Sequence, residues 1–216
     1  MPQRTLRAEQ VSATRRQIMD AAERLYAEEG LYAVSNRQIS AAAGQGNNAA
    51  VGYHFGTKAD LVRAIVRRHA EPTEALRLEM VDRVAGSTEL RDWIECLVRP
   101  SIAHLGSLPQ PTWYARFGAQ VVTDPAFRTI MTEEALATPA LGRMIEGLHR
   151  CLPGLPHEVR AERDAMTRQL MVHMCAERER ALADGAQVTH ASWDGMATGL
   201  VDALTGLWSA GRRTST

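Results

Sequence analysis

Two asparagines stand side by side at Asn47 and Asn48, where a short apolar-patterned segment begins, and the small residue Ala49 follows them. A carboxamide both donates and accepts hydrogen bonds, so it can pair with the edge of a base in the major groove of DNA. A small neighbour would let the segment lie deep in that groove. Because asparagine is also a good helix cap, we expect Asn47 to cap a helix and Asn48 to reach DNA.

Two short helices joined by a glycine turn are expected to position these asparagines. A capping box at residues 35–38 opens the first helix, and Gly44 can adopt the left-handed conformation that ends it. After the tight turn at residues 45–46, a second short helix is expected over about 47–55. Such a pair, over about 36–55, is typical of a helix-turn-helix.

Longer helices are expected on both sides of this pair. From Thr14, which opens another capping box, apolar residues repeat at helical spacing until Gly30. Residues 1–10 show no such period and are expected to form a flexible tail. A further cap at residues 57–60 opens a fourth helix. The sequence therefore predicts a DNA-binding domain over residues 11–70.

The charge distribution agrees with this assignment. The whole chain has 25 basic and 25 acidic residues and no net charge. Residues 1–70 hold ten Arg and Lys against six Asp and Glu, net +4, and the remaining residues hold fifteen against nineteen, net −4. The basic end is thus the part expected to meet phosphate.

The composition favours an all-α fold, because aromatic residues are only 5% of the chain and no long β-branched alternation occurs. Residues 71–216 are expected to form a second, helical domain. The N-terminus has no apolar signal core, and no apolar run approaches the ~20 residues of a membrane span. Three widely spaced cysteines suit a reducing compartment. We therefore expect a cytoplasmic protein.

Two His-x-Cys pairs, at residues 149–151 and 173–175, are the candidates for a metal or redox site. In a helix of about 3.6 residues per turn, residues two apart lie about 200° apart and cannot face one ion. No phosphate-binding glycine loop, HExxH or nucleophile motif occurs. We expect no metal, no cofactor and no catalytic residue, and an all-helical enzyme is the less favoured alternative.

Several motifs in the first domain resemble the TetR family of transcriptional regulators. They are Ala43-Gly44, the run VGYHFGTK at residues 51–58, and Asp60-Leu61; the run DAAERLYAEEG at residues 20–30 is similar to the first helix of the family. Together they cover about residues 14–66. This sequence departs from the family at Gly52, where many members have an aromatic residue, and in a turn that is one residue longer.

The resemblance implies a homodimer that binds a palindromic operator and is released when a small molecule enters the C-terminal domain, with repression the commoner mode. It also implies that Lys58 and Tyr53 contact phosphates, with Arg37 and Gln38 beside the turn. The predicted DNA-binding residues are Arg37, Gln38, Gln45, Asn47, Asn48, Ala49, Tyr53, His54 and Lys58. A regulator controlled by a protein partner is the alternative.

The last two helices, expected at about 157–183 and 190–210, carry broad apolar faces and a row of small residues. We expect them to form a four-helix dimer interface, or else intramolecular core. The predicted interface residues are Met166, Leu170, Met174, Gly195, Gly199, Leu200, Ala203, Leu204 and Leu207. An effector pocket, with apolar walls and few polar anchors, is expected among Trp93, His104, Trp113, Tyr114, Phe117, Gln120, His149, Met171 and His173.

Overall fold

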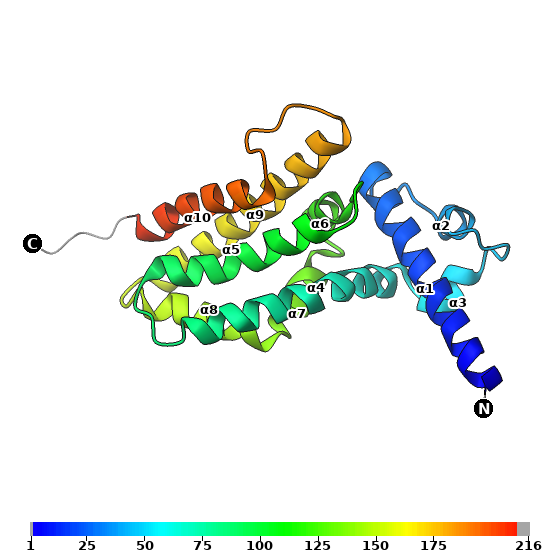
Figure 1. Ribbon diagram of the computed structural model, residues 1–216, viewed down its shortest axis with the longest axis horizontal. Coiled ribbons are helices and arrows are strands. Elements are labelled where there is room, and N and C mark those ends of the chain that lie inside the picture. Colours follow the sequence, from blue (N-terminus) through cyan, green and yellow to red (C-terminus); the bar gives the residue numbers. More distant parts are fainter. Residues whose placement is uncertain (1, 211–216) are drawn as a thin grey trace, which may run out of the picture. The chain divides into compact units, whose positions relative to one another are not determined.

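The computed structural model describes residues 2–210 and the side chains of residues 8–210. Every regular element in this part of the chain is a helix, as predicted for an all-α fold (Figure 1). The helices are α1 (Pro2–Glu29), α2 (Asn36–Ala42), α3 (Ala50–Phe55), α4 (Lys58–Arg83), α5 (Leu90–Ser107), α6 (Tyr114–Thr123), α7 (Arg128–Leu136), α8 (Pro139–Arg150), α9 (His157–Ala183) and α10 (Trp193–Ser209). Within residues 2–210, none of them is both long enough and apolar enough to cross a membrane.

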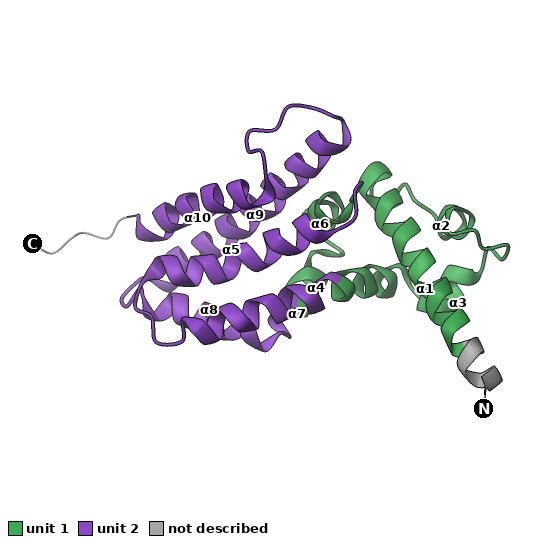
Figure 2. Ribbon diagram, in the orientation of Figure 1, with its two compact units in different colours: residues 1–68, 111–134 green, residues 69–110, 135–216 purple. Residues whose placement is uncertain are grey.

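The chain divides into two compact units (Figure 2). Unit 1 consists of residues 1–68 and 111–134, and unit 2 of residues 69–110 and 135–216. Residues 111–134 were expected in the C-terminal domain, but they pack with the N-terminal helices. The reason is a shared apolar core, which periodicity along the chain does not reveal.

The core of unit 1 collects one apolar face from each of its helices. Residues three and four apart in α1 lie on one side of the helix, and this side faces α6. The largest fully buried side chains of this core are Ile18, Tyr26, Ile39, Leu61, Ile65 and Phe117. These six residues come from α1, α2, α4 and α6, so a single core holds the helix-turn-helix and α6 together.

Helix α1 begins at Pro2, well before the predicted start at Thr14. Proline is tolerated in the first turn of a helix because its missing N–H would have no partner there. The residues that follow it are mostly good helix formers. Helix therefore replaces the flexible tail expected at residues 1–10, of which residue 1 lies outside the described residues.

Ion pairs fix α7 to α4 inside unit 1. The buried Glu134 carboxylate accepts hydrogen bonds from Arg63 and Arg67, and Glu133 accepts a second bond from Arg63. The two arginines lower the pKa of Glu134, although burial opposes them with a raising effect. A buried carboxylate is costly unless it is paired in this way, so α7 is held against this part of α4.

Unit 2 is built around α5, which packs on both α10 and α8. Trp93 of α5 is buried, its indole Nε1 donates to the Ser87 carbonyl over 3.1 Å, and Gly147 of α8 lies directly against its ring. Two exposed ion pairs, Arg91 with Asp202 and Arg99 with Asp194, flank the contact between α5 and α10. Helix α10 also packs on α9.

Helix α9 holds the end of α10 through a buried arginine. Arg163 donates to the carbonyls of Trp208 and Ala210, where a helix end leaves acceptors without a backbone partner. The indole Nε1 of Trp208 donates to Thr167 over 2.9 Å. The observed bounds of α9, His157–Ala183, match the predicted 157–183, and α10 begins three residues later than expected because Ser192 caps it.

Candidate nucleic-acid interface

The α2–turn–α3 segment is fixed by the local signals that predicted it. Ser35 and Gln38 form the reciprocal capping box of α2, and Gly44 has φ +67°, the left-handed conformation that ends this helix. Residues 57–60 cap α4 in the same reciprocal way. The two short helices are therefore placed by caps at both sides of the turn.

Helix α3 is shorter than expected. It begins at Ala50, and residues 47–49 form a turn before it. The Asn47 Oδ1 atom accepts a hydrogen bond from the backbone N–H of Ala49 over 2.9 Å. The N-cap of α3 is Ala49, without a side-chain capping bond, so the prediction that Asn47 caps this helix is wrong. The Asn47 carboxamide oxygen instead holds the turn before α3.

Asn48 differs from its neighbour because its side chain is exposed. Its backbone carbonyl accepts a hydrogen bond from the buried Ser40 hydroxyl over 3.4 Å. This bond fixes the backbone while the carboxamide faces solvent. Ala49 is exposed next to it. A fixed backbone with an exposed amide is the arrangement that base recognition requires.

The apolar side of α3 is buried, and this determines which of its residues stay exposed to solvent. Val51 and Phe55 are buried in the core of unit 1, whereas the Tyr53 side chain is 80% exposed. The His54 ring is half-buried and meets the Tyr53 ring edge-on at 5.0 Å. Gly52 is also exposed, and a side chain at this position would meet open space. Tyr53 is therefore the accessible aromatic residue of α3.

Two of the predicted DNA-binding amides are used inside the protein. The Gln38 Oε1 atom accepts from the Ser35 backbone N–H over 2.9 Å as part of the capping box. The Gln45 amide donates to the Ala43 carbonyl and to the Gln17 side chain. Arg37 beside them is exposed. Of this group, Arg37 is the residue whose charged end is presented to solvent.

Lys58, for which the resemblance implied a phosphate contact, also bonds within the chain. Its Nζ atom donates to the Leu31 carbonyl over 2.6 Å and to the Val34 carbonyl over 2.9 Å, and it lies 5.7 Å from the centre of the Tyr26 ring. Burial lowers the pKa of Lys58 below its usual value. Two of its three N–H donors therefore hold the loop between α1 and α2.

Arg15, which was not among the predicted site residues, ties α1 to α3. The guanidinium donates to the His54 carbonyl at the end of α3 and lies 4.1 Å from the centre of the Phe55 ring. A charged residue in a helical pattern gives no local sign of such a partner, because the contact spans 39 residues of sequence. Arg15 therefore helps to position residues 47–55, the recognition segment.

The nine predicted effector-pocket residues lie in both units. Trp113, Tyr114, Phe117 and Gln120 belong to unit 1, and the other five belong to unit 2. The Phe117 ring is part of the core and stacks on Tyr26 at 6.2 Å, while the Trp113 indole donates to Glu28 over 3.0 Å. These contacts give Phe117 and Trp113 structural roles within unit 1.

In unit 2, His104 is buried and its Nε2 atom lies 2.8 Å from Nδ1 of His69. His149 is half-buried beside the Trp208 ring, and burial lowers its pKa. Met171 is half-buried, whereas His173 is exposed. Because Cys175 is buried, the second His-x-Cys pair faces two sides of α9, as the helical geometry requires.

The predicted dimer-interface residues separate into two groups. Leu200 and Leu204 of α10 are buried within the chain, so their assignment to an intermolecular surface is wrong. Gly195 and Gly199 lie against the His190 side chain of the same chain. These positions serve intramolecular packing because α10 directs its most apolar side toward α5.

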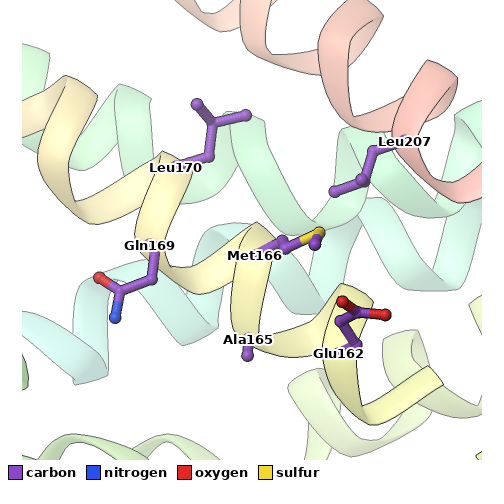
Figure 3. Close-up of a pocket in the computed structure, with 6 residues that line it drawn as sticks. All are labelled: Glu162, Ala165, Met166, Gln169, Leu170 and Leu207. Atoms are coloured by element: carbon purple, nitrogen blue, oxygen red, sulfur yellow. The ribbon is translucent and has the colours of Figure 1, made fainter. Parts of the chain in front are cut away.

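Three of the other predicted interface residues line an open apolar groove between α9 and α10 (Figure 3). Met166 and Leu170 line it from α9, and Leu207 lines it from α10. Met166 is 44% exposed, and Met174, farther along α9, is 40% exposed. Ala203 is exposed on α10. The remaining lining residues are Glu162, Ala165 and Gln169.

Two family models and one solved structure agree with this architecture. The model of bacterial regulatory proteins of the tetR family matches residues 18–65, and the model of the tetracyclin repressor-like C-terminal domain matches residues 95–206. A search of curated proteins gave no significant match. A TetR-family regulator structure from Mesorhizobium loti has 15% identity and a TM-score of 0.53, covering 93% of this chain and 96% of its own. The regulator PfmR from Thermus thermophilus has 20% identity and a TM-score of 0.47, covering 92% and 96%.

Proposed function

Because the chain belongs to the TetR family of DNA-binding transcriptional regulators, we propose that it represses transcription from a palindromic operator as a homodimer, and that a small-molecule effector releases it. The observation that carries the DNA-binding part is the exposure of Asn48, Arg37 and Tyr53 on a segment whose backbone is fixed from within. Asn48 reads bases in the major groove, and Arg37 and Tyr53 contact phosphates. Phosphate contacts position such a protein, whereas base contacts give it specificity.

Selection of random duplex DNA on the purified protein tests this proposal. A palindromic motif should be retained, with half-sites about one helical turn, ~34 Å, apart. Asn48→Ala should relax the preference at one position of each half-site, because a lost base contact costs about 1–3 kcal/mol of discrimination. Gln187→Ala, which removes an exposed amide from the loop before α10, is the matched control. Retention of no sequence at any salt concentration would contradict the DNA-binding proposal.

The homodimer proposal rests on the groove between α9 and α10. Met166, Leu170 and Leu207 present apolar surface there, and a second copy of the chain would remove that surface from water. A two-fold symmetric pair of α9–α10 hairpins would form a four-helix interface. Leu200 and Leu204 would support this surface from behind, because they are buried on the inner side of α10.

Sedimentation of the full chain at micromolar concentration should show a dimer. Met166→Glu should shift it toward the monomer, because a carboxylate in the interface would have to be buried without a partner. Leu136→Glu is the matched control, since Leu136 is 60% exposed at the end of α7 and does not line the groove. A monomer in the unchanged protein would refute this part of the proposal.

Effector release requires that the ligand bind the two states of the protein with different affinities. Ligand binding in the C-terminal body would move α4 and change the separation of the two recognition segments. The expected effector is a modestly apolar molecule, because ligand pockets in proteins are mostly apolar with a few polar anchors. A compound that binds tightly and leaves operator affinity unchanged is not the effector.

A further inference from the structure

The first half of α1 buries none of its described side chains. The buried residues of this helix begin at Ile18, and none of residues 8–17 is buried. A helix that is polar on all sides is stable only if other contacts support it, because isolated helices of this length are marginal in water. This half of the helix is therefore available to a partner outside the chain.

The contacts of α1 place this free half next to the recognition segment. Arg15 donates to the His54 carbonyl at the end of α3, and Gln17 accepts a hydrogen bond from Gln45 in the turn before it. Helix α1 thus contacts the turn before α3 and the C-terminal end of α3, and then continues toward its own N-terminus. The free half of α1 therefore begins next to α3, so DNA bound to α3 would lie beside it.

The charge of the same segment identifies the partner. By sequence, residues 2–17 contain four arginines, Arg4, Arg7, Arg15 and Arg16, against one acid, Glu9, for a net charge of +3. Arg16 is exposed and bonds only to Ser12 of its own helix among the contacts that the structure gives for it. Duplex DNA carries about one negative charge per 1.7 Å of its axis. Charge complementarity and continuity with the recognition segment both favour DNA phosphates.

We propose that the N-terminal half of α1, residues 2–17, is a second DNA-binding element that lies along the phosphate backbone beside the site read by α3. This inference rests on the proposed DNA-binding function and extends its surface. Because the element contacts phosphates, it raises the affinity for every duplex and leaves the sequence preference to Asn48. It also raises the dependence of binding on salt.

Removal of residues 2–10 from the full chain, with Met1 retained, tests the proposal. The deletion takes away Arg4 and Arg7 together with Glu9. Each lost phosphate contact flattens the slope of log affinity against log salt by about 0.9. Two contacts per chain correspond to a slope change of about 1.8 for each chain of the dimer. The affinity difference between the intact and shortened proteins should therefore shrink about tenfold or more between roughly 50 and 200 mM salt. The selected DNA motif should stay the same.

Two further variants make the result specific. Glu9→Gln removes the acid of the segment and should strengthen binding to all duplexes. The double variant Arg83→Ala and Arg180→Ala removes two arginines from unit 2 and should leave the slope unchanged. The melting temperature of the shortened protein should equal that of the intact chain, because the deletion removes no buried side chain that the structure describes.

The outcomes separate this inference from the proposed function. If the intact chain selects a motif and the shortened chain binds it with the same affinity and salt slope, the second DNA-binding element is refuted and the DNA-binding function stands. If the intact chain selects no DNA, the proposed function itself fails. A shortened chain with weaker, less salt-dependent binding to the same motif supports the inference.

Discussion

Replacing Gly147 with alanine places a methyl group directly against the Trp93 ring. A Cβ atom built on Gly147 would lie 2.3 Å from Cε3 and 2.4 Å from Cδ2 of Trp93. Carbon atoms in contact are normally about 3.5–4.0 Å apart, so one side must move by more than about 1 Å. The ring is 1% exposed and is held by its bond to the Ser87 carbonyl. The movement must therefore involve α5 or α8.

The expected cost follows from two opposing effects. Overpacking a well-packed core costs about 1–3 kcal/mol, whereas alanine stabilises a helix by about 1 kcal/mol relative to glycine. Gly142→Ala separates the two effects, because Gly142 lies in the same helix with nothing within 4 Å of the new methyl group. We expect Gly142→Ala to stabilise the protein by up to about 1 kcal/mol. Gly147→Ala should be less stable than this control by about 1–3 kcal/mol.

Thermal unfolding of the two variants measures the difference. For a protein of this size, about 1 kcal/mol corresponds to about 2–4 °C in Tm. Trp93→Phe in the Gly147→Ala background supplies a cycle, since a smaller ring should recover part of the loss and give a coupling free energy between contacting residues. If Gly147→Ala melts at the same temperature as Gly142→Ala, the close contact between α5 and α8 is refuted.

Three other predictions follow from buried groups. Arg163→Met should lower the free energy of unfolding by about 1.5–3 kcal/mol in urea denaturation, because it removes charge-assisted bonds to the last carbonyls of α10; an unchanged midpoint would refute the anchor. Burial raises the pKa of Cys96 to about 11 and of Cys175 to about 12. At about pH 8 the half-buried Cys151 should therefore react first with a thiol reagent. All three cysteines should react in denaturant. Lys58→Ala should destabilise unit 1 as well as weaken binding to every duplex, because the Lys58 ammonium holds the loop between α1 and α2. Weaker binding with unchanged stability would favour a role in phosphate contact alone.

The family resemblance could be recognised from short motifs because the signals that define them are local. A capping box joins residues three apart, and Gly44 adopts the left-handed conformation that a side chain would oppose. The bounds of α9 were predicted for the same reason. Caps, glycine turns and helical periodicity therefore suffice to place the helix-turn-helix and the long C-terminal helices along the chain.

The exact set of surface residues at the candidate interface depended on contacts between distant parts of the chain. Sequence spacing could not show that Gln45 donates to Gln17, or that Lys58 donates to two loop carbonyls. Arg15 had no local signature for its role against α3. Long polar side chains have several partners within reach, and the backbone positions of distant residues decide among them.

The fold, like the candidate interface, depended partly on local signals and partly on contacts between distant parts of the chain. The sequence by itself determined that the chain is all-α, that its first part carries a helix-turn-helix, and that α10 has an apolar face. Only the tertiary structure decided that this face covers α5, which buries Leu200 and Leu204, and that residues 111–134 share a core with the first helices. Periodicity states that one side of a helix must be buried, but the burial free energy is non-directional and does not name the partner.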